Sequence, residues 1–299
     1  MARIAVTGAS GRLGSAVVQL LDTRPGWSTV AWSRADFDLD APASVTETLD
    51  RDRPDIVIHC AAWTDVDGCA REPDLALQRN GLATGTLARG CAQRGAGLVV
   101  VSTNEVFDGL RTDGEPYRPT DPTSPPNPYG RSKLRGEEEA RAAFAGADIP
   151  LWIVRTAWLF GPPGRDFPTK IAAAARGALT DGQPLRLVSD EVGNPTFTAD
   201  LAAGIIDLVG DPRSAGLQHV VNSGHASRAT WARRVLAELG IRVETEDVPM
   251  DTWQRASEPP RWGVLEPTDL PTLGRLRPWH VALAADLRAR PPVMSEASP

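Results

Sequence analysis

The sequence lacks the features that would direct a protein to a membrane, to secretion or to nucleic acid. It has no apolar run of membrane-spanning length and no signal-like segment. Its formal net charge is -6, so no general basic field is present to attract nucleic acid or an anionic membrane surface. We therefore expect a cytoplasmic protein with neither partner, in which a few local groups hold any anionic ligand.

Cysteine is also scarce. Cys60, Cys69 and Cys91 are odd in number, lack CxxC spacing and belong to no cluster with His and Asp. The sequence therefore predicts no disulfide framework and no metal site, and favours small buried side chains. No internal repeat or low-complexity block is present. The 299 residues can fill a core without a partner chain, and a homodimer stays open as one oligomeric state.

Short apolar runs alternate with longer Ala-, Leu- and Arg-rich segments. The runs, at residues 3–7, 28–33, 55–60, 97–102 and 151–156, predict strands separated by helices. This order is typical of an α/β fold, with a Rossmann-like, doubly wound parallel sheet covered on both faces. Because ligands of such sheets bind beyond the carboxyl ends of the strands, the residues directly after each run are the candidate site.

The pattern changes after about residue 160, where Gly- and Pro-rich loops separate shorter elements. We expect residues 1–160 to form the main domain and residues 161–299 to form mainly a smaller α/β lobe. Helical patterns at 198–209 and 228–239 and a strand at 218–222 are predicted in that part, and the segment from about 198 to 222 can return to the main sheet. Residues 291–299 are expected to fray.

The first predicted strand runs into TGASGRLG at residues 7–14, a GxxGxxG turn that opens a helical pattern. Glycines permit a tight turn and a close approach of backbone to a pyrophosphate, and the helix N-terminus offers N–H groups to it. A plain turn is the alternative, but the place of the motif in a βαβ unit favours dinucleotide binding. The predicted contacts are Gly8, Ser10, Gly11, Arg12, Leu13 and Gly14.

The second predicted strand ends at Ser33 and Arg34, without the carboxylate that would accept a ribose 2′-hydroxyl. Arg34 can instead meet a 2′-phosphate, which favours NADPH as the cofactor, with NADH left open as a second one. Asp38 and Leu39 would then contact the adenine. Alternatively, the aspartates of this segment form only a solvated turn.

Tyr129 and Lys133 are four residues apart, behind an Asn-Pro pair that suits a helix N-cap. Their side chains would share one helix face, and the ammonium would lower the pKa of the phenol and make Tyr129 a proton donor. The sequence contains only two tyrosines, which weakens the alternative of an ordinary surface pair. At the end of the fourth strand, Thr103 is preferred over Ser102 as the hydroxyl that binds a substrate oxygen.

An ordered series of motifs resembles the extended short-chain dehydrogenases/reductases, and within them the dTDP-4-dehydrorhamnose reductases, over nearly the whole length. The motifs are VTGASGRLG (6–14), AAWTDVD (61–67), STNEVFDG (102–109), YGRSK (129–133), RTAWLFG (155–161) and VGNPT (192–196). The resemblance implies an N-terminal NADP(H)-binding lobe and a C-terminal sugar-nucleotide lobe. It further implies reduction of the C4 keto group of a nucleotide-activated 6-deoxyhexose, dTDP-4-dehydro-L-rhamnose giving dTDP-L-rhamnose.

The same resemblance implies roles for individual residues. Thr103, Tyr129 and Lys133 would form the catalytic set, and Tyr129 and Lys133 would also touch the cofactor. Ala61, Ala62 and Thr64 would line the cofactor. The substrate would meet Val66, Asn104, Glu105, Trp158 and Arg261.

The sequence departs from the reductase pattern after the catalytic threonine, where Asn104 and Glu105 replace the usual Asp-Tyr. Glu105 is similar to the glutamate of the Thr-Asp-Glu signature in related sugar-nucleotide 4,6-dehydratases. An amide at position 104 cannot act as a general acid, which disfavours dehydration and leaves Glu105 to orient sugar hydroxyls. An epimerase or dehydratase, and a non-catalytic NADP(H)-binding regulatory subunit, are the alternative functions. The sugar and the nucleotide base stay open.

Overall fold

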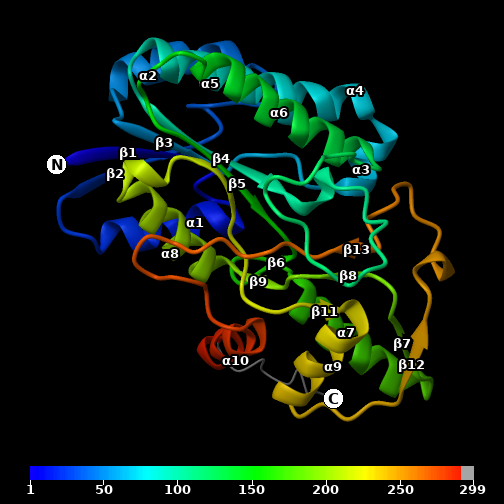
Figure 1. Ribbon diagram of the computed structural model, residues 1–299. Helices are drawn as coiled ribbons and strands as arrows, with labels where there is room; N and C mark the ends of the chain where they lie inside the picture. Colours follow the sequence, from blue (N-terminus) through cyan, green and yellow to red (C-terminus); the bar gives the residue numbers. More distant parts are fainter. Residues whose placement is uncertain (291–299) are drawn as a thin grey trace.

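The five apolar runs form strands of one parallel sheet, which a sixth strand from later in the chain completes (Figure 1). The protein was studied as a computed structural model that describes residues 1–290. The strand order is β10-β5-β4-β3-β1-β2, and every neighbouring pair is parallel. The bounds are β1 Ala2–Thr7, β2 Trp27–Trp32, β3 Ile56–His59, β4 Gly97–Thr103, β5 Leu151–Thr156 and β10 Gly216–His219. The predicted doubly wound fold class is confirmed.

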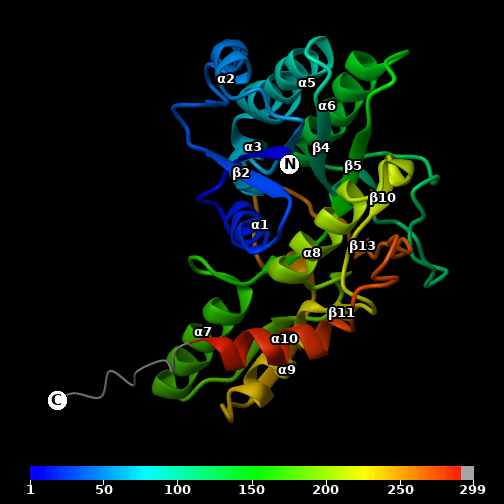
Figure 2. The same cartoon turned by 90° about the vertical axis from the view of Figure 1, so that its left-hand side faces the viewer.

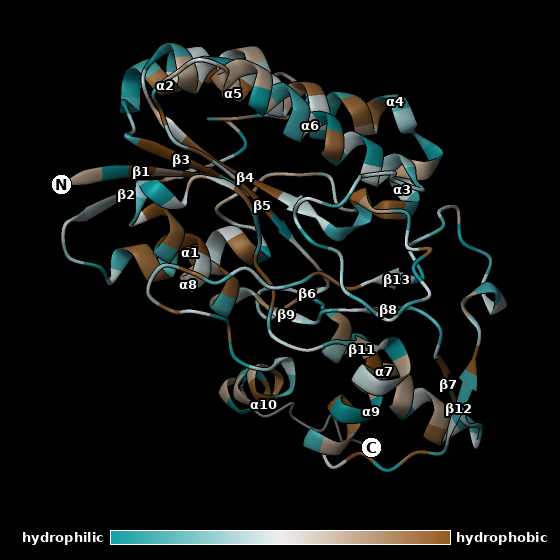
Figure 3. Cartoon of the chain, in the orientation of Figure 1, coloured by the Kyte–Doolittle hydropathy of each residue, from teal (hydrophilic) through white to brown (hydrophobic). Residues whose placement is uncertain are grey.

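Helices cover both faces of this sheet, as the edge-on view of Figure 2 shows. One face carries α1 (Arg12–Asp22) and α8 (Thr198–Val209), which pack against each other. The other carries α2 (Val45–Asp52), α5 (Ala83–Gln93) and α6 (Pro128–Phe144). Apolar residues that follow one another along a strand enter opposite cores: Val99 lies in the α1/α8 core, whereas Leu98 and Val100 lie in the α2/α5/α6 core. Burial on both sides explains why these strands are continuous apolar runs, which are brown in Figure 3.

Short elements follow the carboxyl ends of the strands and shape the site. They are η1 (Pro42–Ser44), α3 (Val66–Arg71), α4 (Pro73–Ala76), η3 (Asn104–Val106) and the π-helical segment η2 (Leu77–Leu82), which leads directly into α5. A loop and then α3 follow β3, and η3 directly follows β4. Both bring side chains to the edge of the sheet where the strands end.

A smaller lobe lies below the sheet in Figure 1 and is built mainly from α7 (Phe167–Asp181), α9 (Arg228–Glu238) and α10 (Trp279–Ala289). Three small sheets complete it: β7 (Leu185–Val188) with β12 (Thr245–Val248); β8 (Val192–Gly193) between β11 (Ala226–Ser227) and β13 (Trp262–Gly263); and β6 (Leu159–Phe160) with β9 (Thr196–Phe197). The short segment η5 (Met250–Thr252) lies between β12 and β13, and η4 (Pro212–Ser214) joins α8 to β10 of the main sheet. Buried aromatic and apolar side chains around Trp231 give this lobe a core of its own.

The chain returns to the main sheet between residues 198 and 219. The helix α8 packs on α1, and β10 pairs with β5, with Gly216 opposite Trp152. The predicted strand at 218–222 therefore begins and ends earlier than expected, because the apolar pair Val220-Val221 is buried beyond the strand's end. The division at residue 160 stays a prediction, and the expected fraying of 291–299 concerns residues outside the described part. Among residues 1–290, no helix has the length and apolar character needed to cross a bilayer.

Candidate active site

Three cavities open near the carboxyl ends of the parallel strands, where the topology places a ligand. The central cavity, of about 430 Å³, lies between the start of α1, the ends of β4 and β5, and the start of α6. The β2 cavity, of about 360 Å³, extends from the glycine turn to the residues after β2. The outer cavity, of about 640 Å³, lies beside the segment between β12 and β13. Each volume falls in the range of small-molecule sites, about 300–1,000 Å³.

The glycine turn can be built only without side chains at two of its positions. Gly8 has φ +62°, and a Cβ there would lie 2.8 Å from the backbone nitrogen of Ala61. A Cβ on Gly14 would lie 2.1 Å from the carbonyl oxygen of Gly8, inside any allowed contact. The first-turn N–H groups of α1 have no intrahelical acceptor, and no side-chain cap at Gly11 supplies one. The turn therefore fits an anionic pyrophosphate, as the sequence predicts for a dinucleotide.

Of the predicted glycine-turn residues, Gly11, Arg12 and Leu13 line the central cavity, and Gly8, Ser10 and Gly11 line the β2 cavity. Gly14 lines neither cavity, because at this position the backbone of α1 packs directly against the backbone of Gly8. Ala61 and Ala62 lie along the β2 cavity, and Ala62, Thr64 and Val66 along the central one. The two cavities share Gly11, Cys60 and Ala62, so one elongated ligand can reach both.

Arg34, Asp38 and Leu39 all line the β2 cavity, at the end of β2. The Arg34 side chain is 74% exposed and donates to the carboxylates of Asp38, at 3.1 Å, and Asp40, at 2.8 Å. These contacts raise the pKa of Arg34, and the pKa of Asp38 is lowered first by a hydrogen bond from the Asp40 backbone nitrogen and then by Arg34. The structure thus brings the predicted arginine and the aspartates of the turn to one place.

The helix α6 begins as its sequence predicts. Asn127 is the N-cap, where its side-chain oxygen accepts a hydrogen bond from the Gly130 nitrogen at 2.8 Å, and Pro128 occupies the first turn. Tyr129 and Lys133 follow on one face of the helix and both line the central cavity. Thr103, at the end of β4, lines the same cavity. The three residues of the predicted catalytic set are therefore assembled from two elements.

The electrostatics of this set differ from the expectation. The pKa of Tyr129 is raised, first by burial and then by the charge of Glu105, while the Thr103 hydroxyl acts in the opposite direction. Burial also lowers the pKa of Lys133 to about 8, although Glu137 raises it. The pKa of Tyr129 is thus raised on balance rather than lowered as expected, because the loss of hydration on burial dominates.

The hydroxyls at the end of β4 have separate partners. Ser102 Oγ donates to the buried carboxylate of Glu137 at 2.6 Å, so it is held away from any reacting oxygen. Thr103 Oγ1 accepts from the backbone nitrogen of Glu105 at 3.2 Å and donates to Asn104 Oδ1 at 3.4 Å. Asn104 is buried and donates from Nδ2 to the carbonyl oxygen of Gly263 at 3.0 Å, which ties β4 to β13.

Glu105 lines the central cavity and accepts a hydrogen bond from Asn127 Nδ2 at 2.6 Å. Burial raises the pKa of its carboxyl to about 7; Asn127 opposes this shift, and the charge of Glu191 adds to it. Glu105 therefore titrates near neutral pH, unlike an ordinary surface glutamate.

Glu137 is a buried charged residue behind the catalytic set that the sequence reasoning missed. It is fully buried, and it accepts hydrogen bonds from Arg155, at 2.8 and 2.9 Å, and from Ser102. The paired charge holds its pKa below the usual value in spite of burial. Its spacing was a usable signal, since it lies four residues after Lys133 and continues the helix face that carries Tyr129.

The predicted substrate residue Trp158 lines the central cavity in an unusual backbone conformation, with φ +46°. Its ring stacks on Trp231, with the centroids 5.7 Å apart, and the Arg228 guanidinium carbon lies 3.6 Å from its ring centroid. The carboxylate of Glu191 holds Arg228 at 2.7 and 2.9 Å. Arg228 also lines the cavity, and nothing in the sequence identified it, because it comes from the smaller lobe.

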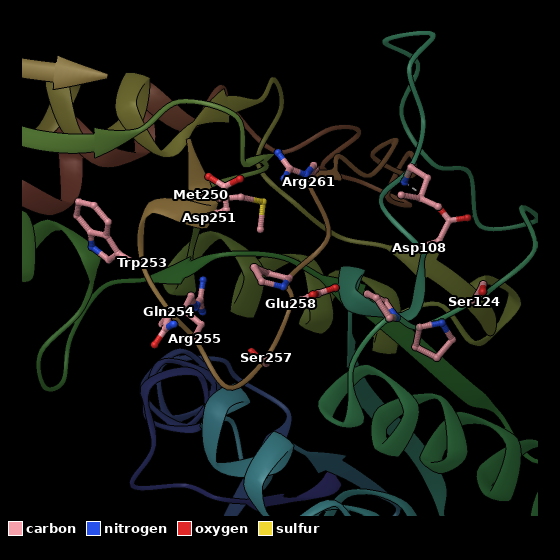
Figure 4. A pocket seen from close by; sticks show the side chains of 14 residues that line it. Asp108, Ser124, Met250, Asp251, Trp253, Gln254, Arg255, Ser257, Glu258 and Arg261 are labelled. Carbon is pink, nitrogen blue, oxygen red and sulfur yellow. Dashed lines mark hydrogen bonds between the residues drawn. The ribbon is translucent and has the colours of Figure 1, made fainter. Parts of the chain in front are cut away.

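Arg261 lies apart from the other predicted substrate residues. It lines the outer cavity (Figure 4), and its guanidinium pairs with the carboxylate of Asp190. The segment from Met250 to Arg261 borders one side of this cavity, and Asp108 and Ser124 border the other (Figure 4). The segment also meets the main domain, because Ser257 bonds to Asp67, at the start of α3, at 3.0 Å.

Within the part of the chain that the structure describes, no group of three or more His, Cys, Asp or Glu side chains is arranged to hold a metal ion. The three cysteines are unpaired, and burial raises the pKa of each thiol. These thiols are poor nucleophiles for that reason.

Comparisons with known proteins show the family to which the chain belongs. A family model described as RmlD substrate binding domain matches residues 2–290. The chain is 37% identical over 294 residues to a dTDP-4-dehydrorhamnose reductase of Mycobacterium tuberculosis, which covers 96% of this chain and 93% of that protein. It is 34% identical over 291 residues to the spore coat polysaccharide biosynthesis protein SpsK of Bacillus subtilis, with 97% and 98% covered. A crystal structure of dTDP-4-dehydrorhamnose reductase from Bacillus anthracis in complex with NADP superposes with a TM-score of 0.88 at 28% identity, covering 97% of this chain and 100% of that one.

Proposed function

The chain belongs to the RmlD substrate binding domain family, and we propose from this membership that it is an NADPH-dependent oxidoreductase acting on a nucleotide-activated sugar. Its reaction is reduction of the C4 keto group of a 6-deoxyhexose, with dTDP-4-dehydro-L-rhamnose converted to dTDP-L-rhamnose. The observation that carries the proposal is the meeting of Thr103, Tyr129 and Lys133 in one cavity with the glycine turn. The reductases named above and the NADP complex of one of them support the same reading.

When bound, the cofactor would supply the hydride, and a side chain of the central cavity donates the proton. The Thr103 and Tyr129 hydroxyls hold the substrate oxygen, and Tyr129 gives its proton to that oxygen as negative charge develops there. The raised pKa of Tyr129 keeps the phenol protonated at neutral pH. An alcohol is a still weaker acid than a phenol, so the transfer remains favourable in the direction of reduction.

Lys133 acts on Tyr129 and on the cofactor from one helical turn away. With a pKa of about 8 it carries its charge in most molecules at pH 7, and it favours the phenolate that remains after proton transfer. The buried ion pair of Glu137 and Arg155 lies next to Lys133 on the same helix face. The charge of Glu137 raises the pKa of Lys133 and so favours its charged form. Removing Glu137 would leave the buried charge of Arg155 without its carboxylate, whereas removing Arg155 would leave Glu137 paired with Arg141 alone.

The remaining cavity residues orient the sugar. Glu105 and Asn104 lie directly after Thr103, and Val66 and Trp158 close the cavity around the same space. Because Asn104 donates to Gly263 and accepts from Thr103, its amide holds Thr103 in place beside the sugar. Arg261, in the outer cavity, contacts a part of the substrate distant from the reacting carbon.

The cellular setting follows from the same proposal. A cytoplasmic enzyme with reduced thiols, acting on a small nucleotide-sugar and on no nucleic acid, fits a net charge of -6 and three unpaired cysteines. A homodimer is the oligomer that we propose, and sedimentation equilibrium of the full chain measures it directly.

The function is tested by incubating the full chain with NADPH and a panel of dTDP- and UDP-linked 4-keto-6-deoxyhexoses. The expected result is one NADPH oxidised per sugar reduced, with the alcohol at C4 identified by NMR. An epimerase or dehydratase would form product without net NADPH oxidation, and a regulatory subunit would bind NADPH without turnover. Either outcome would refute the proposal.

A further inference from the structure

A second arginine faces the position proposed for the 2′-phosphate. Arg79 belongs to the π-helical segment η2, and both Arg79 and Arg34 line the β2 cavity. The glycine turn lines the same cavity. A ligand held at the turn therefore extends toward two guanidinium groups rather than one.

Both guanidinium groups converge on one carboxylate. Arg79 binds Asp40 through two hydrogen bonds, from Nε at 2.5 Å and from Nη2 at 2.8 Å. Arg34 donates from Nη2 to the same oxygen, Asp40 Oδ2, at 2.8 Å. A two-pronged contact of this kind is the geometry with which arginine also binds phosphate oxygens.

Arg79 is held more firmly than Arg34. Its side chain is 26% exposed, against 74% for Arg34, and its guanidinium carbon lies 5.0 Å from the ring centroid of Trp63. The backbone of Trp63 is in turn fixed by Asn80, which is buried and bonds to its nitrogen at 2.8 Å and to its oxygen at 3.0 Å. A guanidinium that is less hydrated and already oriented binds an anion more strongly than an exposed, mobile one.

We propose that Arg79 is a determinant of NADPH specificity, and that Asp40 is an internal anion that competes with the adenosine 2′-phosphate for Arg79 and Arg34. This inference deepens the proposed function, since it rests on NADPH as the cofactor. Phosphate binding exchanges the hydrogen bonds to Asp40 for bonds to phosphate oxygens. The affinity for the 2′-phosphate therefore depends on how much more strongly Arg79 and Arg34 bind the phosphate than they bind the carboxylate of Asp40.

The test is calorimetric titration of the full chain with adenosine 2′,5′-bisphosphate and with adenosine 5′-monophosphate, which differ only in the 2′-phosphate. Arg79→Gln should weaken binding of the bisphosphate by about ten- to a hundredfold, the contribution of hydrogen bonds to a charged group. Binding of the monophosphate should change by less than about twofold, which also shows that the variant is folded. Arg79→Lys, which keeps the charge without the fork, should lie between the two.

Matched controls come from the pair of Arg94 and Asp50, which has similar hydrogen bonds but lines a different cavity. Arg94→Gln should leave both affinities unchanged. Asp40→Asn should strengthen bisphosphate binding by about threefold or more, because the competing charge is removed while an amide oxygen remains, whereas Asp50→Asn should have no effect.

Two results would overturn the inference. If Arg79→Gln retains the wild-type preference for the bisphosphate, Arg79 does not read the 2′-phosphate. If Asp40→Asn weakens bisphosphate binding as much as Arg79→Gln does, the cluster is a structural clamp and not a competed anion site. Either result would contradict the inference and leave the proposed function, NADPH oxidation with a keto-sugar, standing. A wild-type protein that binds the bisphosphate no more tightly than the monophosphate would refute both NADPH as the cofactor and the role of Arg79.

Discussion

The raised pKa of Glu105 makes the stability of the protein depend on pH in a way that one substitution should remove. Burial moves the pKa of this carboxyl from 4.5 to about 7. Each pKa unit corresponds to about 1.4 kcal/mol, so the folded state loses up to about 3 kcal/mol relative to the unfolded state when Glu105 ionises. Because the folded pKa is the higher one, this stability is fully present below pH 4.5 and is lost as the pH rises through 7.

Glu105→Gln removes the titrating group and keeps an oxygen that accepts from Asn127 Nδ2, the 2.6 Å contact of the wild type. The variant should therefore gain stability relative to wild type between pH 5 and pH 8, by up to about 3 kcal/mol. Partial exposure of the side chain toward the cavity makes this figure an upper value. The free energy of unfolding is measured by urea denaturation of both proteins at several pH values in that window.

The matched control is Glu138→Gln, since Glu138 is exposed on α6, close to the site in sequence but facing solvent. Its difference from wild type should stay nearly constant over the same pH range. A constant difference for Glu105→Gln as well would show that the carboxylate is well hydrated in the folded protein. The assignment of Glu105 as a buried group that titrates near neutrality would then be wrong.

Three further predictions concern the reaction. Tyr129→Phe should lower kcat by about 10²–10⁴-fold while NADPH binding, followed by fluorescence titration, stays almost intact; a variant that keeps most of its kcat would remove Tyr129 from the mechanism. Arg34→Ala should weaken NADPH much more than NADH, and equal losses in the two dissociation constants would contradict a contact with the 2′-phosphate. Wild-type enzyme incubated with the keto-sugar in D₂O should introduce no deuterium at C3 or C5, as read by NMR. Exchange that disappears in Glu105→Gln would instead identify Glu105 as a base and favour an epimerase or dehydratase.

Much of the site was predictable because its parts are local in sequence. The glycine turn needs positions without a Cβ, at Gly8 and Gly14, and the Asn-Pro pair before Tyr129 specifies the start of a helix. Parallel topology then decides that strand ends meet at one edge, which brings Thr103 to the cavity of Tyr129 and Lys133. Each step is signalled by a motif in the sequence, although the contact that excludes a Cβ at Gly8 is with the distant Ala61.

The smaller lobe was less predictable, because its elements are short and carry weaker patterns. The strand expected at 218–222 was displaced by the buried pair Val220-Val221, since apolar residues beyond a strand end give the same pattern as the strand itself. Arg228 and Arg79 were missed because arginine is common in this sequence and only their neighbours in space distinguish them. Arg228 is distinguished by its contact with the ring of Trp158, and Arg79 by its hydrogen bonds to Asp40.

By itself the sequence determined the fold class, the dinucleotide turn and the Tyr129/Lys133 helix, since each depends on backbone requirements and on spacing along a single element. Only the tertiary structure decided the electrostatics. The pKa values of Tyr129, Lys133 and Glu105 depend on how much water the folded chain removes and on which charges it brings close. Hydration and long-range charge are properties of the packed molecule, and no spacing in the sequence records them.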